Sequence, residues 1–265
     1  MKLIYAVKNI GFIAVLTLLL SSCEEVIDID VNQNQPKLVI EGNVTDELGK
    51  QFVKVSETVP FKNKSAIKEI SGATVMIQEE NGQLYHLTEE SNGLYSASFK
   101  GLSGKKYYLA VTINDKTYQA SCVMPEKVVL DSISVTQVSM FDEKRNFLKL
   151  HYQDPPEEGN AYRYIIKNNG VPYKGFFVSN DKFDNGRYVN RTVYTDDPKI
   201  EVDDNIDVEF LCISPEVYKY FYSLVQITGG GGPPVSAGNP VSNISGDALG
   251  YFSAHTIQRN SFQVK

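Results

Sequence analysis

The stretch that decides the fold is Gly104-Lys105-Lys106-Tyr107-Tyr108-Leu109-Ala110-Val111-Thr112-Ile113-Asn114-Asp115. Every second residue from Tyr107 to Ile113 is large and apolar, which is the period of a β-strand with one buried face. Asn114-Asp115 has turn chemistry, and a second strand pattern follows over Thr117–Met124. The stretch therefore predicts a β-hairpin whose first strand packs against a hydrophobic core.

The same alternation extends outward from this hairpin, back to Lys37 and on to Pro125. Turn signals such as Asn92-Gly93 separate roughly seven strand-like runs at a spacing of about 8–12 residues, which is typical of an antiparallel β-sandwich. Residues 37–125 are therefore predicted to form one sandwich. Gly104 followed by Tyr107 also resembles the tyrosine corner of immunoglobulin-like and fibronectin-like domains, in which the phenol bonds backbone while the ring fills the core.

Strand-like runs resume beyond Pro125, so residues 126–265 are predicted to form a second sandwich. One segment, about 215–228, has the helical period instead, with Ser214 as N-cap and Pro215 at N1. Its apolar face comprises Val217, Phe221, Leu224 and Val225, and the neighbouring stripe of Tyr218 and Tyr222 is also expected to be core. The predicted fold class is all-β, with two immunoglobulin/fibronectin-like β-sandwich domains, the second carrying one packed α-helix.

The amino-terminal residues 1–22 are predicted to be a lipoprotein signal peptide. Lys2 and Lys8 precede an apolar run, Ile10–Leu20, whose eleven helical residues would span about 16 Å. That length is about half of a bilayer core, which favours a secretory signal over a transmembrane helix. Leu20-Ser21-Ser22-Cys23 closely resembles a lipobox, so Cys23 is expected to carry the lipid that anchors the chain.

Residues 23–36 form an acidic tether that ends at Pro36. A solvated linker that holds the folded part away from the membrane explains the composition. Glu24 and Glu25, directly after the cysteine, also resemble the signal that sends Bacteroidetes lipoproteins to the outer leaflet of the outer membrane. We therefore expect a lipid-anchored outer-membrane protein, exposed at the cell surface rather than on the periplasmic leaflet.

The charge of the chain excludes two classes of partner. Removing Lys2 and Lys8 leaves 24 of the 26 basic residues against 32 acidic ones, so the mature chain carries −8. An acidic chain without a basic run is a poor partner for nucleic acid or for an anionic membrane surface. Contact with the membrane is therefore expected through the lipid alone.

Two cysteines remain besides the one assigned to lipid. Cys122 and Cys212 each lie in an apolar strand pattern, which favours two small buried hydrophobic residues, although an exported pair could also form a disulfide. The sequence holds no CxxC pair and no Cys/His cluster, so no metal site is predicted.

The sequence contains no recognisable catalytic motif. His86, His151 and His255 are far apart, and neither a GxSxG elbow nor an HExxH helix is present. We therefore predict a protein that is not an enzyme and needs no cofactor. A hydrolase whose residues come together from separate strands stays open as an alternative.

Two polar loops are the candidate sites for a ligand or a partner, because sandwich loops commonly bind. Their residues are Asn180, Asp181, Asp184 and Asn185 in the turn Asn180–Gly186, and Gly229, Gly230, Gly231, Gly232 and Pro233 in a connector. The first loop has oxygen ligands that calcium prefers, but plain turn chemistry explains it better. The second lacks the Lys-Ser/Thr of a phosphate loop. Asp131-Ser132-Ile133 resembles a short glycosylation motif, which makes Ser132 a candidate for modification.

Taken together, these segments resemble the Bacteroidetes lipoprotein family designated domain of unknown function 4249. The resemblance is carried by the lipobox with its acidic tether and, in order, by Leu38–Gly42, Val53–Thr58, Ser71–Val75, Gly93–Tyr95, Gly104–Leu109, Asn185-Gly186, Ile213–Tyr218 with Tyr220-Phe221, and Ser242–Ile244 through Gly250–Phe252. Such proteins are often encoded beside TonB-dependent receptors. The resemblance therefore implies an accessory that captures ligand or takes part in its uptake beside such a receptor.

Two other functions compete with this accessory role. A stand-alone glycan-binding or adhesive module would need exposed aromatic rings, for which Tyr173, Phe176 and Phe177 are candidates. The ligand would then be a glycan, whereas the accessory role also admits a peptide. A hydrolase would need one of the histidines within reach of a serine or a carboxylate in a concave pocket.

Overall fold

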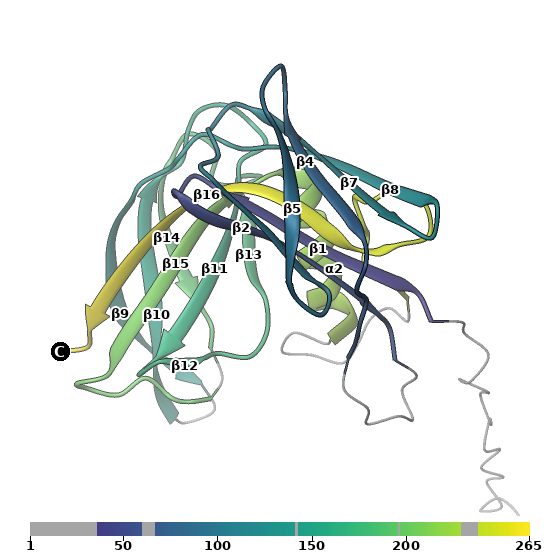
Figure 1. Cartoon of the computed structure of the whole chain (residues 1–265). Helices are drawn as coiled ribbons and strands as arrows, with labels where there is room; N and C mark the ends of the chain where they lie inside the picture. Colours follow the sequence, from purple (N-terminus) through teal and green to yellow (C-terminus); the bar gives the residue numbers. More distant parts are fainter. Residues whose placement is uncertain (1–35, 60–66, 141–142, 196, 229–237) are drawn as a thin grey trace, which may run out of the picture. The chain divides into compact units, whose positions relative to one another are not determined.

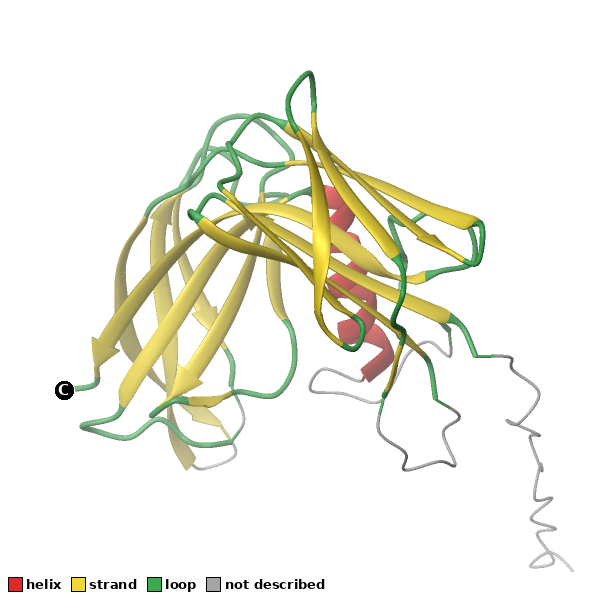
Figure 2. Cartoon of the chain, viewed as in Figure 1, coloured by secondary structure: helices red, strands yellow, loops and turns green. Residues whose placement is uncertain are grey.

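The computed structural model describes residues 36–59, 67–140, 143–195, 197–228 and 238–265. Strands dominate these residues, and a single helix, α2 (Pro215–Thr228), accompanies them (Figure 2). The predicted all-β class with one helix is confirmed. Among the described residues, no helix is long and apolar enough to cross a membrane.

The first half of the chain folds around one hydrophobic core. Its strands are β1 (Leu38–Thr45), β2 (Gly49–Glu57), β3 (Lys68–Glu69), β4 (Thr74–Glu79), β5 (Leu84–Ser91), β6 (Leu94–Phe99), β7 (Lys106–Ile113) and β8 (Lys116–Val123). They follow the spatial order β1-β2-β6-β5-β4-β7-β8, with β3 beside β2. The first residues of β5 pair with β4 and its last residues pair with β6, so this strand passes from one layer to the other.

The second half builds a second core between two layers. Its strands are β9 (Leu130–Met140), β10 (Glu143–Gln153), β11 (Ala161–Asn168), β12 (Val171–Pro172), β13 (Phe177–Asn180), β14 (Tyr188–Val193) and β15 (Asn205–Ile213). β14, β10 and β9 form a separate three-stranded sheet, and β11 and β15 continue the large sheet. Leu148, Leu150 and Tyr152 from the small sheet pack with Tyr162 and Phe210 from the large one.

The last strand, β16 (Leu249–Gln263), belongs to both halves. Val39–Thr45 of β1 pair with its first residues in parallel, and β15 pairs with Thr256–Gln263 in antiparallel register (Figure 1). The predicted boundary at Pro125 falls between the two hydrophobic cores. However, α2 and the start of β16, which follow that boundary in sequence, pack into the first core.

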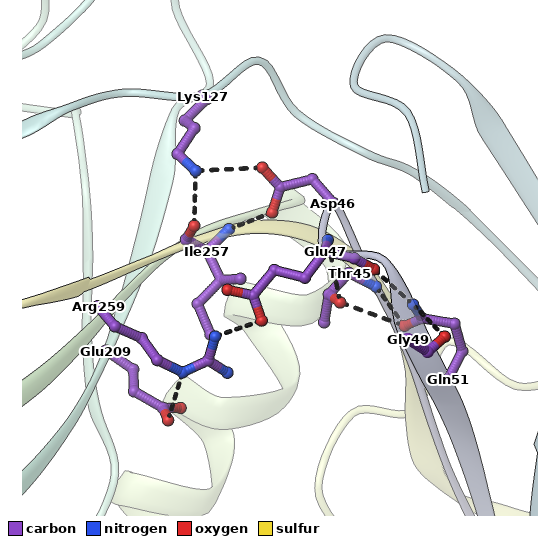
Figure 3. A network of polar contacts seen from close by, with 9 residues as sticks. All are labelled: Thr45, Asp46, Glu47, Gly49, Gln51, Lys127, Glu209, Ile257 and Arg259. Carbon is purple, nitrogen blue, oxygen red and sulfur yellow. Dashed lines mark hydrogen bonds and ion pairs between the residues drawn. The ribbon is translucent and has the colours of Figure 1, made fainter. Parts of the chain in front are cut away.

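A polar network holds the β1–β2 turn against β16 where this strand changes partner (Figure 3). The Asp46 carboxylate accepts the Ile257 amide at 2.8 Å and pairs with the Lys127 ammonium at 3.2 Å. The Lys127 ammonium also donates to the Ile257 carbonyl at 2.7 Å. Because the Ile257 amide and carbonyl are both bonded by side chains, β16 can leave β1 for β15 without an orphaned backbone group at this residue.

Helix α2 begins where the sequence predicts it. The Val217 amide donates to the Ser214 hydroxyl at 3.4 Å, which confirms the N-cap. Val217 and Phe221 are buried as predicted, and Tyr220, outside the predicted face, is buried as well. Tyr222 is 47% exposed, so the prediction of a wholly buried tyrosine stripe is wrong at this position. The neighbouring Tyr218 ring stacks on it.

Val225, predicted on the buried face of α2, is only half-buried. The predictions for Tyr107, Cys122 and Cys212 are confirmed. Tyr107 is fully buried, and its phenol accepts the Leu102 amide at 2.8 Å, as a tyrosine corner requires. Cys122 and Cys212 are both free and buried, in β8 and β15 respectively. They act as small hydrophobic residues in the described structure.

Candidate functional site

A concave surface lies on the first sandwich, on the solvent side of β4, β7 and β8. We call it the outer groove, a hollow of about 690 Å³. Strand pairing fixes its floor: Gln78 lies opposite Tyr108, and Tyr108 lies opposite Ser121 on the next strand. Two residues farther along β7, Ala110 lies opposite Gln119. Side chains at alternate positions face one side of a sheet, so these residues share one surface.

The wall of the outer groove comes from a distant part of the chain, Ser242–Ser245, which runs beside β8 (Figure 1). The Ser245 amide donates to the Gln119 carbonyl at 2.7 Å, and the Gln119 amide donates to the Ser245 hydroxyl at 2.8 Å. The Asn243 side chain accepts the Phe252 amide at 2.9 Å and donates to the Phe252 carbonyl at 2.8 Å. The wall is therefore tied both to the edge of β8 and to the start of β16.

The polar side chains of the floor are available for a ligand. Gln78 and Gln119 are exposed, and within the described ranges neither side-chain amide makes a hydrogen bond to the protein. The Tyr108 ring is 40% exposed, and the Lys106 ammonium lies 5.3 Å from its centroid. An aromatic ring flanked by unused amides is a common way of holding a small polar ligand.

A second cavity, of about 510 Å³, lies where α2 begins. Cys122 and Cys212 line it together with the charged side chains Lys106, Glu126 and Glu216. Burial raises the pKa of both thiols. These thiols are therefore poor nucleophiles, because the thiolate is the reactive form.

The predicted loop Asn180–Gly186 is a turn held in place by a neighbouring loop and by β14. The buried Asp181 carboxylate accepts the Gly159 and Asn160 amides, each at 2.7 Å, and the Asp184 carboxylate pairs with Arg191. These contacts confirm the turn chemistry. No group of three or more His, Cys, Asp or Glu side chains among the described residues is arranged to hold a metal ion.

A buried carboxylate near this turn was not predicted. Asp154 is fully buried, accepts the Tyr162 hydroxyl, and accepts the Gly186 amide at 3.2 Å. Burial raises the pKa of Asp154, and the nearby Asp181 and Asp184 carboxylates raise it further. Both oxygens are bonded within the protein, so we assign this residue to the stability of the turn.

Two of the three histidines contact a serine. His151 on β10 lies 2.7 Å from the Ser134 hydroxyl through Nε2 and 2.5 Å from the Asn190 amide oxygen through Nδ1. His255 is buried and lies 2.9 Å from the Ser253 hydroxyl. Neither pair lines the outer groove or the second cavity.

The aromatic residues predicted as sugar platforms lie elsewhere. Tyr173 is buried in the second core, Phe177 packs against the same core, and Phe176 packs against the first core and the Phe221 ring. Tyr108, the exposed ring of the outer groove, was not among the predicted site residues. The alternating pattern of its strand predicted only that Tyr108 lies on the face opposite the core.

Some predicted residues fall outside the part of the chain that the structure describes. They are Cys23, Glu24, Glu25 and the connector Gly229, Gly230, Gly231, Gly232 and Pro233. Ser132 is described and is exposed on β9, at the edge of the three-stranded sheet. Modification of this hydroxyl stays a prediction.

Comparisons with known proteins identify a family. No curated protein matches the sequence. A solved structure titled "Cytokine receptor complex - Crystal form 1A" aligns over 84% of this chain and 94% of that chain at 8% identity, with a TM-score of 0.25, too low to support any argument. A family profile described as "Domain of unknown function (DUF4249)" matches residues 24–261. Since this match spans nearly the whole length, the chain belongs to the DUF4249 family.

Proposed function

We propose that this chain is a lipid-anchored, non-enzymatic binding protein of the outer membrane. It holds a ligand in the outer groove and works beside a TonB-dependent receptor in capture or uptake of that ligand. The observation that carries the proposal is the outer groove itself, a concave surface with an exposed tyrosine and two unused amides. Ligand sites are characteristically concave, with a few polar groups that fix the ligand's orientation.

The lipobox supports the anchoring part of the proposal. The family match begins at Glu24, directly after Cys23, which is consistent with a mature chain that starts at this cysteine. Metabolic labelling with an alkyne palmitate tests it: the wild-type protein takes up the label and Cys23→Ser does not. Protease shaving of intact cells separates the cell surface from the periplasmic leaflet.

Co-purification from detergent-solubilised outer membranes tests the partner. We expect a tagged chain to retain a TonB-dependent receptor, with the Cys23→Ser variant as the control that never reaches the membrane. Repeated purifications without such a receptor would contradict the accessory role. That result would favour a stand-alone glycan-binding or adhesive module, which needs only the groove.

The hydrolase hypothesis has one observation in its favour, the contact of His151 with Ser134 and Asn190. We rank it below binding because the three residues lie on paired strands away from the outer groove. The second contact, between His255 and Ser253, lies in the buried interior, where a substrate has no access.

A further inference from the structure

We infer that the ligand of the outer groove is an uncharged oligosaccharide. This inference rests on the proposed binding function and names the chemical class of its ligand. It follows from the charge of the lining, its hydrogen-bonding groups, its aromatic ring and the state of the neighbouring strand edge.

The lining of the outer groove carries no formal charge. None of its thirteen described residues is Asp, Glu, Lys, Arg or His, although 22% of the chain is charged. A cation beside it, the Lys106 ammonium, lies 5.3 Å from the centroid of the Tyr108 ring and also lines the second cavity. A charged group that leaves water without a partner of opposite charge pays a large desolvation cost. The lining itself offers a charged ligand no such partner, so it favours a neutral one.

The polar groups of the lining match hydroxyls. The side-chain amides of Gln78 and Gln119 each offer both a donor and an acceptor, and a sugar hydroxyl also has both. Ser121 and Ser245 add hydroxyls at the same surface. Because these groups come from different strands and from the wall, they can bind several hydroxyls of one ligand.

The apolar part of the groove surrounds the tyrosine. Tyr108 lies between Gln78 and Ser121 on the neighbouring strands, and Leu84, 43% exposed, extends the apolar surface. Amphipathic aromatic side chains bury an apolar body while a polar tip stays wet. A pyranose has the complementary form, with a C–H face for the ring and a rim of hydroxyls for the amides.

The edge of the sheet argues against a peptide as the ligand. Extended peptides commonly bind by adding a strand to an open sheet edge. Beside the outer groove, the edge of β8 is occupied at its middle, since Ile244 pairs with Ala120 and Ser245 bonds the Gln119 backbone. An uncharged ligand that needs no backbone pairing fits this geometry better.

A glycan array probed with the full mature chain tests the inference, with neutral, sulfated and uronic-acid-containing oligosaccharides and with neutral peptides as competitors. We expect binding to neutral oligosaccharides alone. Tyr108→Ala should weaken the affinity for the best neutral oligosaccharide at least tenfold, and Tyr108→Phe should keep most of it. Tyr188→Ala is the matched control, because Tyr188 is 52% exposed on β14 of the other sandwich.

The outcomes separate the inference from the proposed function. Preference for charged oligosaccharides or peptides, or an unchanged affinity in Tyr108→Ala, would overturn the inference. If Tyr108→Ala does not fold, Gln78→Ala takes its place with the same expectation. Receptor co-purification should survive Tyr108→Ala, so loss of sugar binding and loss of the receptor are independent readouts.

Discussion

The outer groove and the outer face of the three-stranded sheet carry similar polar residues, but the two sets differ in their hydrogen bonding. On the three-stranded sheet, Ser134, His151 and Asn190 bond one another across neighbouring strands. In the outer groove, the amides of Gln78 and Gln119 have no partner among the described residues. Polar groups that bond each other stabilise a surface, whereas exposed amides that bond only water can exchange it for a ligand.

The largest expected effect is a loss of folding stability at low pH that is not accompanied by a loss of ligand binding. Burial lowers the pKa of His255 to about 4, with the Arg163 cation as a further cause. As the pH falls, His255 therefore becomes protonated near pH 6.5 in the unfolded chain but only near pH 4 in the folded chain. The contribution of His255 to the free energy of unfolding is fully present above pH 6.5 and is lost progressively down to about pH 4. The loss from this residue is about 3 kcal/mol. Binding in the uncharged outer groove should not follow this change while the protein stays folded.

Urea denaturation at pH 7 and pH 4.5 measures this dependence. His255→Gln should have a smaller difference in unfolding free energy between the two pH values than the wild-type protein. Equal differences would show that His255 is not the group that titrates. The comparison uses differences within each variant, so a lower overall stability of His255→Gln does not affect it.

The second prediction concerns the wall of the outer groove. Asn243→Ala leaves the Phe252 amide and carbonyl without their side-chain partner. We expect a loss of about 2 kcal/mol of unfolding free energy and at least a tenfold loss of ligand affinity. Asn190→Ala, the matched amide on the three-stranded sheet, should leave the affinity unchanged. Retained affinity in Asn243→Ala would mean that the wall is not part of the site.

Local features of the fold were predictable, and features that join distant segments were not. The Tyr107 corner and the Ser214 cap each depend on residues within a few positions, so the pattern predicted both. The change of partner along β16 leaves no local signal, because both of its halves have strand propensity. The outer groove was also hidden, since Gln119 and Ser245 meet across 126 residues.

The third prediction tests the opposite face. His151→Ala removes the hydrogen bonds to Ser134 and Asn190. These groups are partly solvated, so we expect a loss of only about 1 kcal/mol in thermal or urea unfolding. Affinity for the groove ligand should stay within experimental error of the wild-type value. A change in affinity without a change in stability would transfer the binding role to this face.

The smallest expected effect is the reactivity of Ser134. A serine nucleophile needs a base, a group that orients the base, and donors that stabilise the oxyanion, and loss of a single oxyanion donor typically costs about 10²–10³ in rate. The structure supplies the first two through His151 and Asn190, but Ser134 lines neither of the cavities described above. A fluorophosphonate probe should therefore label wild-type protein no more than Ser134→Ala. Labelling that disappears in both Ser134→Ala and His151→Ala would instead make the three-stranded sheet a hydrolytic site, and the contrast between a binding face and a structural face would no longer hold.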